Sequence, residues 1–230
     1  MIGEALDWHG VARPSRDLEL RGAHVLLRPV DAALDAEDLY PETAAPELWR
    51  YMSAGPYRDA GEVRAALLGM EASVDPHFFT FVRLRDERAV GTGGYMRIKP
   101  DHGVIEIGSL MFGVSLQRTA AATEVIYLLA AHAFEELGYR RVEWKCDALN
   151  EASRRAALRF GFRFEGVFRQ HMVVKGRSRD TAWFAITDGE WPSVAAGFRA
   201  WLAHSNFDAD GRQRRSLGEL IDAARRGPSR

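Results

Sequence analysis

The stretch SLQRTAAATEV, residues 115–125, joins an apolar run to a long alanine-rich segment. The first backbone N–H groups of a helix have no internal partner and carry a partial positive charge, so they attract phosphate. Arg118 would add a full positive charge at the same place. Two interpretations follow: a loop that binds pyrophosphate, or an ordinary helix start with Thr119 as its N-cap.

A second stretch, CDALNEASRRAALRFGFRFEG at residues 146–166, carries side chains suited to an amide ligand. Asn150 follows a predicted strand, and its amide both donates and accepts hydrogen bonds. Ser153 lies one helical turn later, on the same side. Each residue could simply cap the helix, but the two stretches together indicate a ligand-binding site.

The predicted elements place both stretches where a strand meets a helix. Apolar periodicity, N-caps and turn residues define these elements. The predicted strands cover residues 24–30, 77–84, 88–98, 103–114, 139–146, 163–174 and 179–187. The predicted helices cover residues 31–40, 59–74, 119–137 and 150–160, with two more after residue 188. This order predicts an α/β (α+β) fold with a mixed sheet, because both crossovers flanking residues 139–146 are helical.

Composition narrows the classes of function. The chain has 230 residues, 47% hydrophobic and 27% charged, with a net charge of −1, which gives no support for nucleic-acid or membrane binding. Cys146 is the single cysteine, which excludes an intrachain disulfide and fits a cytoplasmic protein. No apolar run approaches the roughly 20 residues that span a bilayer. No residue cluster has the spacing of metal ligands, so we expect no metal.

These residues resemble the GNAT superfamily of acyl-CoA-dependent N-acyltransferases, and look closest to the branch with the ribosomal-protein N-terminal acetyltransferases. Gln117, Ala120 and Ala122 match the loop pattern Gln/Arg-x-x-Gly-x-Gly/Ala. The downstream pattern is matched by Asn150, Ser153, Ala157-Leu158, Gly161-Phe162 and Glu165-Gly166. The resemblance implies an acyltransferase domain over residues 22–188. Before it, residues 1–21 look like a polar lead-in, and after Asp188 the change in character predicts a helical extension over residues 189–230.

The resemblance implies a fold with a mostly antiparallel sheet, helices on both faces, and two central parallel strands that splay apart to hold acetyl-CoA. Residues expected to bind it are Leu110, Met111, Phe112, Val114, Gln117, Arg118, Thr119, Ala120, Ala121, Ala122, Asn150 and Ser153. The spacing from Glu106 to Gln117 is one residue longer than expected for this branch. A β-bulge would absorb the extra residue.

The implied chemistry is direct attack of a neutral amine on a thioester, which needs a base for the amine and an acid for the thiolate. Glu106 is the candidate base, or else a strand residue in a salt bridge. Many relatives place a tyrosine acid where this chain has Ala157. Ser153 is the candidate acid, or else only a helix cap.

The acceptor is expected between the early helices and the hairpin. Trp49, Tyr51 and Tyr57 are candidate substrate-binding residues, although aromatic side chains there could equally be packing. The basic residues Lys175, Arg177 and Arg179 of the hairpin could favour an acidic acceptor.

The expected function is acetyl transfer to a primary amine of a protein N-terminus or a small molecule. The alternative is a non-catalytic acyl-CoA-binding or sensing domain. The helical stripe over residues 194–202 packs on the chain's own core or forms a homodimer.

Overall fold

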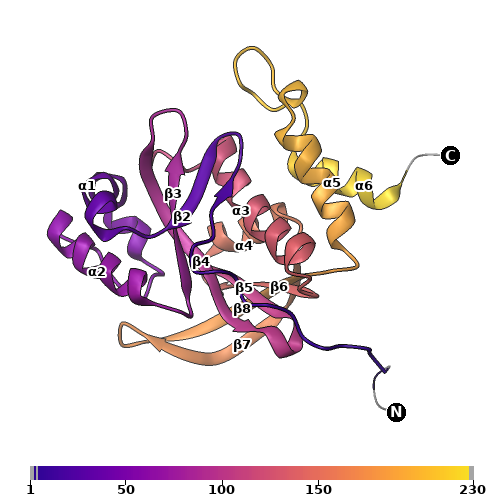
Figure 1. The fold of residues 1–230 in the computed structure, drawn as a ribbon, viewed down its shortest axis with the longest axis horizontal. Helices are drawn as coiled ribbons and strands as arrows, with labels where there is room; N and C mark the ends of the chain where they lie inside the picture. The colour runs from indigo at the N-terminus through magenta and orange to yellow at the C-terminus, as the bar shows by residue number, and fades with distance from the viewer. Residues whose placement is uncertain (1–2, 4, 228–230) are drawn as a thin grey trace.

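The computed structural model describes residues 3 and 5–227 and contains an eight-stranded mixed sheet in the order β1-β2-β3-β4-β5-β6-β8-β7. Helices α1 and α2 lie to one side of the sheet and α3 to the other (Figure 1). Two hydrophobic cores result: a small one under α1 and α2 and a large one under α3 and the C-terminal helices. The predicted fold class is confirmed.

The elements follow the predicted order with one strand more, because residues 20 and 21 of the expected lead-in pair with β2. The strands are β1 (Leu20–Arg21), β2 (Val25–Pro29), β3 (His77–Arg83), β4 (Arg88–Lys99), β5 (Val104–Phe112), β6 (Arg141–Asp147), β7 (Arg163–Val174) and β8 (Arg177–Thr187). The helices are α1 (Ala32–Thr43), α2 (Ala60–Ala72), α3 (Ala120–Ala131), α4 (Glu151–Arg159), α5 (Trp191–Leu202) and α6 (Leu217–Arg226). Short helical turns are η1 (Pro46–Trp49), η2 (Pro100–His102), η3 (His132–Glu136) and η4 (His204–Asn206). The predicted antiparallel meander is confirmed as β3, β4 and β5.

Helix α1 begins as predicted but ends later. The Asp31 carboxylate accepts hydrogen bonds from the first-turn amides of Ala33 and Leu34. The expected end before Pro41 is wrong, because the helix continues to Thr43. Pro41 costs one backbone hydrogen bond near the helix end. The Thr43 hydroxyl donates to the Leu39 carbonyl at 2.7 Å and closes the last turn.

Helix α3 is shorter than predicted. It ends at Ala131, and a wider π-helical turn, η3, covers His132–Glu136. The Tyr139 amide donates to the Ala133 carbonyl at 2.9 Å, and Gly138 between them has a φ of 74°. Glycine tolerates this left-handed backbone, which turns the chain sharply into β6.

The parallel strands β5 and β6 pair only at their beginnings. Three residue pairs join them, and the last is Glu106 with Glu143. Beyond it the two strands diverge, so their facing backbone edges have no partner strand. The β5 register also shifts opposite Gly93, where Ser109 has a φ of 51°. The predicted bulge therefore lies at the start of the divergence.

The C-terminal extension is folded against the rest of the chain. Phe198 of α5 stacks with Phe160 at the end of α4, with ring centroids 6.1 Å apart. A Cβ at Gly197 would lie 2.4 Å from Cγ1 of Ile221, so α5 and α6 approach closely at this glycine. Among the described residues, no helix is both long and apolar enough to cross a membrane.

Candidate active site

A cleft of about 1820 Å³ opens where β5 and β6 diverge. Its walls are the inner edges of the two strands, the first turn of α3 and one side of α4. The unpaired edges can form backbone hydrogen bonds with an extended ligand, as they would with an additional strand. An extended ligand would therefore find backbone hydrogen-bonding partners along the cleft.

The loop before α3 lies at one end of this cleft. Thr119 caps the helix, since its hydroxyl accepts from the Ala122 amide at 3.2 Å. Within the described part of the chain, the backbone N–H groups of residues 118–121 have no hydrogen-bond acceptor. Arg118 has a φ of 61° and no ion-pair partner among these residues. The alanines are helical, so the left-handed backbone that often requires glycine falls on Arg118 instead.

Most of the residues expected to bind acetyl-CoA line this cleft. They are Leu110, Met111, Phe112, Gln117, Arg118, Thr119, Ala120, Ala122, Asn150 and Ser153. Val114 and Ala121 do not line it. Val114 points to solvent and its amide donates to the Glu42 carbonyl at 3.0 Å, while Ala121 is buried in the core.

Asn150 and Ser153 lie together on the α4 wall. The Asn150 side-chain oxygen accepts from the Ser153 amide at 3.1 Å, which caps the helix. The Ser153 Oγ accepts from the indole N–H of Trp144 at 3.0 Å, so its own hydroxyl proton can point to another acceptor. Cys146 is buried beside it, and this burial raises the pKa of the thiol.

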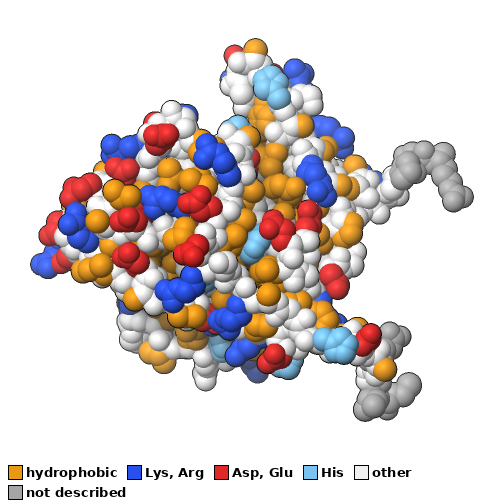
Figure 2. Space-filling model, in the orientation of Figure 1, with side chains coloured by type: hydrophobic (Ala, Val, Ile, Leu, Met, Phe, Trp, Pro, Cys, Tyr) orange, Lys and Arg blue, Asp and Glu red, His pale blue; other side chains and the backbone are white. Residues whose placement is uncertain are grey.

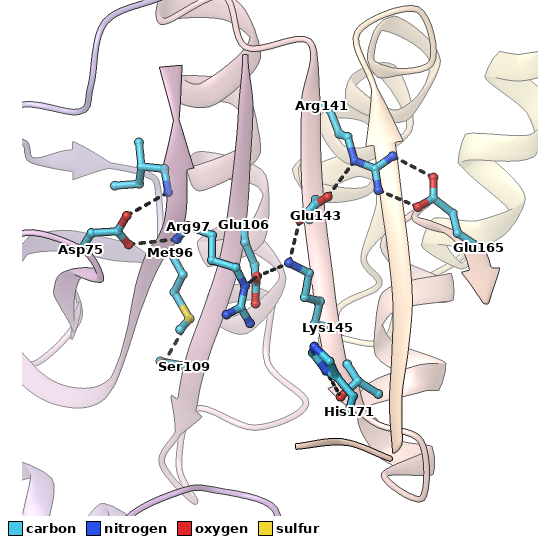
Figure 3. Close-up of polar contacts among 12 residues, drawn as sticks. Asp75, Met96, Arg97, Glu106, Ser109, Arg141, Glu143, Lys145, Glu165 and His171 are labelled. Carbon is cyan, nitrogen blue, oxygen red and sulfur yellow. Dashed lines mark hydrogen bonds and ion pairs between the residues drawn. The ribbon is translucent and has the colours of Figure 1, made fainter. Parts of the chain in front are cut away.

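A buried network of charges crosses the sheet at the point of divergence (Figure 3). The Lys145 ammonium lies 2.9 Å from Oε2 of Glu106 and 2.8 Å from Oε2 of Glu143. It also lies 3.7 Å from the centroid of the Trp183 ring. Arg141 continues the chain of alternating charges by pairing with Glu143 and Glu165.

Glu106 is held from two sides. Its Oε2 contacts Nε of Arg97 at 2.7 Å as well as Lys145, while Oε1 has no ion-pair partner in the described chain. Asp75 accepts from the amides of Arg97 and Ile98, which fixes the β4 irregularity where Arg97 has a φ of 46°. Glu106 is 3% exposed, yet it lines the cleft.

Contacts between distant segments close the side of the cleft where the acceptor was expected. Tyr51 lines the cleft, and its hydroxyl donates to the Leu149 carbonyl at 3.1 Å. Lys175 at the hairpin tip donates to the carbonyls of Trp49 and Gly55 at 3.1 and 3.0 Å. Lys175 therefore joins the hairpin tip to the segment 49–55 through hydrogen bonds.

The other two expected aromatic residues do not line the cleft. Trp49 is 6% exposed and donates from its indole N–H to the Thr43 carbonyl at 2.7 Å. Tyr57 packs edge-on against it, with ring centroids 4.9 Å apart. Their place in the structure fits the packing alternative.

Several cleft residues were not expected from the sequence: Arg97, Trp144, Lys145, Arg159, Trp201 and Phe207. Arg179, one of the basic hairpin residues expected near the acceptor, also lines the cleft. Lys145 did give a signal, because Glu143 and Lys145 alternate within an apolar strand and so share one face. Arg159, Trp201 and Phe207 come from α4 and the extension, and no local pattern marks them. The described residues contain no group of three or more His, Cys, Asp or Glu side chains able to hold a metal.

Comparison with protein families agrees with this geometry. Residues 24–163 match the family model described as an acetyltransferase (GNAT) domain. The match includes both walls of the cleft up to the beginning of β7, but not the C-terminal extension.

Individual relatives extend the comparison. The chain is 41% identical to a GCN5-related N-acetyltransferase from Brucella melitensis of known structure, with a TM-score of 0.92 over 94% of this chain and 99% of that one. It is 28% identical to a protein named Uncharacterized N-acetyltransferase p20 from Bacillus licheniformis, over 68% of this chain and 89% of that protein. The ribosomal-protein-S5-alanine acetyltransferase of Vibrio fischeri shares the fold at 15% identity and a TM-score of 0.59, over 76% of this chain and 99% of that one.

Proposed function

Because the chain belongs to the GNAT acetyltransferase family, we propose that it transfers the acetyl group of acetyl-CoA to a primary amine by direct attack. The observation that carries this proposal is the single continuous cleft at the divergence of β5 and β6. Unpartnered amides at the start of α3 suit the pyrophosphate, and the free strand edges suit the pantetheine arm. The acceptor is the amine of a protein N-terminus or of a small molecule.

The amine must lose a proton as it attacks. Its nitrogen bonds to the carbonyl carbon, the carbon–sulfur bond breaks, and the sulfur leaves as a thiolate. Glu106 can receive the amine proton through Oε1, directly or through a water, because its two cationic partners occupy Oε2. Arg97 and Lys145 thus position the base and hold its carboxylate in one orientation.

The leaving thiolate needs a proton donor. Ser153 can supply one, since Trp144 donates to its Oγ and leaves the hydroxyl proton free to point into the cleft. Ala157 lies on the buried face of α4 and carries no hydroxyl, so a tyrosine mechanism from that position is excluded. Asn150 caps the helix that carries Ser153 and could also reach the pantetheine arm.

Thiol release from acetyl-CoA over a panel of peptide N-termini and small amines tests the activity. The variant Glu106→Gln should lower kcat by a factor of about 100 or more, as loss of a general base does, with little change in the KM for acetyl-CoA. Glu151→Gln, an exposed change on α4, is the matched control and should leave both constants unchanged.

Binding must be measured separately, by calorimetric titration with CoA. Ala120→Trp should abolish measurable binding, because Ala120 lines the cleft at the expected pyrophosphate site. CoA binding without thiol release for any amine in the panel would favour the sensing alternative. Equal kcat in Glu106→Gln and the unmodified chain would remove Glu106 from the mechanism.

A further inference from the structure

The C-terminal extension forms part of the cleft wall although it lies outside residues 24–163, which match the family model. In Figure 1 it lies beside α3 and α4, and in Figure 2 hydrophobic side chains gather where it meets the main body. Trp201, at the end of α5, and Phe207, after η4, both line the cleft. The extension thus borders the same continuous space as the α3 loop.

The segment 201–213, which we name the C-terminal wall, is held in one conformation by its own contacts. The Trp201 indole N–H donates to the Gln213 side-chain oxygen at 2.7 Å. The backbones of Phe207 and Gln213 pair in an isolated antiparallel β-bridge. Asn206 is buried and donates to the carbonyls of Trp201 and Arg215. A loop that is fixed in this way presents a preformed surface to the cleft.

Arg159 brings a positive charge to the junction of the C-terminal wall with α3 and α4. Its guanidinium donates to the Thr123 hydroxyl at 3.1 Å and lies 5.1 Å from the centroids of the Phe160 and Trp201 rings. No carboxylate pairs with it among the described residues. Thr123 lies one helical turn after Ala120, so Arg159 is close to the unpartnered amides of α3.

The one acidic side chain of the C-terminal wall that lines the cleft is turned toward its own loop. The Asp208 carboxylate accepts from the amides of Asp210 and Arg212 at 3.0 and 2.8 Å. The surface that remains is aromatic, with a cation at its edge: Phe207 packs edge-on against Trp201 with centroids 5.2 Å apart. Aromatic faces and an unpaired arginine are what a nucleotide base and its phosphate bind best.

We propose that the C-terminal wall binds the adenosine end of CoA, with the base against Phe207, which the buried Trp201 supports from behind, and a nucleotide phosphate near Arg159. This proposal rests on the proposed function, since a pantetheine arm between β5 and β6 and a pyrophosphate at α3 leave the nucleotide to continue toward this wall. The extension is then a binding element for the acyl donor and not only a packing element.

Calorimetric titration with CoA and with 4′-phosphopantetheine, which lacks the adenosine, tests this assignment. Ala209 is exposed and lines the cleft, so Ala209→Trp should fill the base position without disturbing the core. Phe207→Ala removes a stacking surface instead. Each variant should bind CoA about tenfold more weakly and bind 4′-phosphopantetheine as the unmodified chain does.

Ser205→Trp is the matched control, because Ser205 is exposed in η4 and does not line the cleft. It should leave both affinities unchanged. Unchanged CoA affinity in both Ala209→Trp and Phe207→Ala would overturn the assignment while leaving acetyl transfer intact. Equal weakening of both ligands would also overturn it, because the extension would then act only through the shape of the whole cleft. An unmodified chain that binds neither ligand would instead refute the proposed function.

Discussion

The ammonium group of Lys145 lies between the carboxylates of Glu106 and Glu143, and its side chain is 2% exposed. Charges buried to this degree are tolerated only when each has a partner of opposite sign. Glu106 also contacts Arg97, and Glu143 also contacts Arg141, which pairs in turn with Glu165. The six side chains carry three positive and three negative charges, so the network is neutral. Loss of Lys145 would remove the cation that lies between the two buried carboxylates.

We therefore expect Lys145→Met to lower the free energy of unfolding by about 3 kcal/mol. This is the lower end of the usual cost of breaking a buried ion pair, because Arg97 and Arg141 still pair with the two carboxylates. Urea unfolding monitored by tryptophan fluorescence measures the change. Arg155→Ala, which removes an exposed pair with Glu151, is the control and should cost less than about 1 kcal/mol. A cost for Lys145→Met no greater than the control's would show that the two arginines suffice.

Single residues were predictable from the sequence where local chemistry marks them. Asn150 and Ser153 occupy a helix start, and Glu106 interrupts an apolar strand, so their types alone indicate a role. Arg97 was not predictable, because its contact with Glu106 depends on an irregular β4 register fixed by Asp75. Trp49 and Tyr51 are neighbours of similar type, and only tertiary packing makes one structural and the other part of the cleft.

Helix α3 is joined to the sheet edge by one side chain as well as by its apolar face. The Glu124 carboxylate, which is buried, accepts from the backbone amides of Ala23, His24 and Val25 at 2.8, 2.7 and 3.0 Å. A Cβ at Gly22 would lie 2.2 Å from Cδ of Glu124, so only glycine leaves room for the carboxylate there. The same helix therefore fixes the β1–β2 turn and offers its N-terminus to the cleft.

Replacing this carboxylate by an amide should destabilise the fold. Glu124→Gln retains the size of the side chain but puts an N–H donor where an acceptor is needed, so we expect a loss of about 1–3 kcal/mol in the free energy of unfolding. Chemical denaturation of the variant and of the exposed control Glu151→Gln provides the measurement. Matching midpoints for the two variants would show that the Glu124 hydrogen bonds contribute nothing net.

At the scale of elements, the sequence predicted the order and type of nearly every strand and helix, because apolar periodicity and caps are local signals. The errors are at helix ends and in the lead-in, where β1 was not predicted. Pro41 is tolerated inside α1, and η3 replaces the last turns of the expected long helix. Both depend on tertiary contacts that compensate lost or altered backbone hydrogen bonds.

Two histidines from different parts of the chain are buried: His77 at the start of β3 and His132 at the start of η3. His77 and His132 are 6% and 4% exposed, and burial lowers the pKa of each below its usual value near 6.5. Above that value neither the folded nor the unfolded chain binds a proton at these sites, so their full contribution to stability is present. As the pH falls from 6.5 toward the lowered folded pKa, the unfolded chain binds more protons and stability is lost.

Urea unfolding between pH 7.5 and pH 5.5 should therefore show a free energy that is constant above about pH 6.5 and decreases below it. His132→Gln should flatten the decrease, because an amide can still hydrogen-bond the Tyr95 hydroxyl, which lies 3.1 Å from Nδ1. His9→Gln, which changes an exposed histidine, should leave the pH dependence as it was. An identical slope in His132→Gln and the unmodified chain would remove His132 as its source.

The overall assembly was less predictable than its parts. The apolar stripe of α5 indicated that the extension packs on something, but not that it reaches the cleft, because that requires the loop after η4 to turn back toward α4. Contacts between segments so far apart in the chain leave no local pattern. Figure 2 shows acidic and basic side chains interspersed over α1 and α2.

Cys146 gives this chain a built-in reporter. It is the single cysteine, and it lies in the cleft beside Ser153. Its buried thiol, with a raised pKa, reacts slowly with an alkylating reagent, and a ligand in the cleft covers it further. The mass of the intact protein after timed alkylation would consequently report the occupied fraction of the cleft without a label, an inserted residue or a known acceptor.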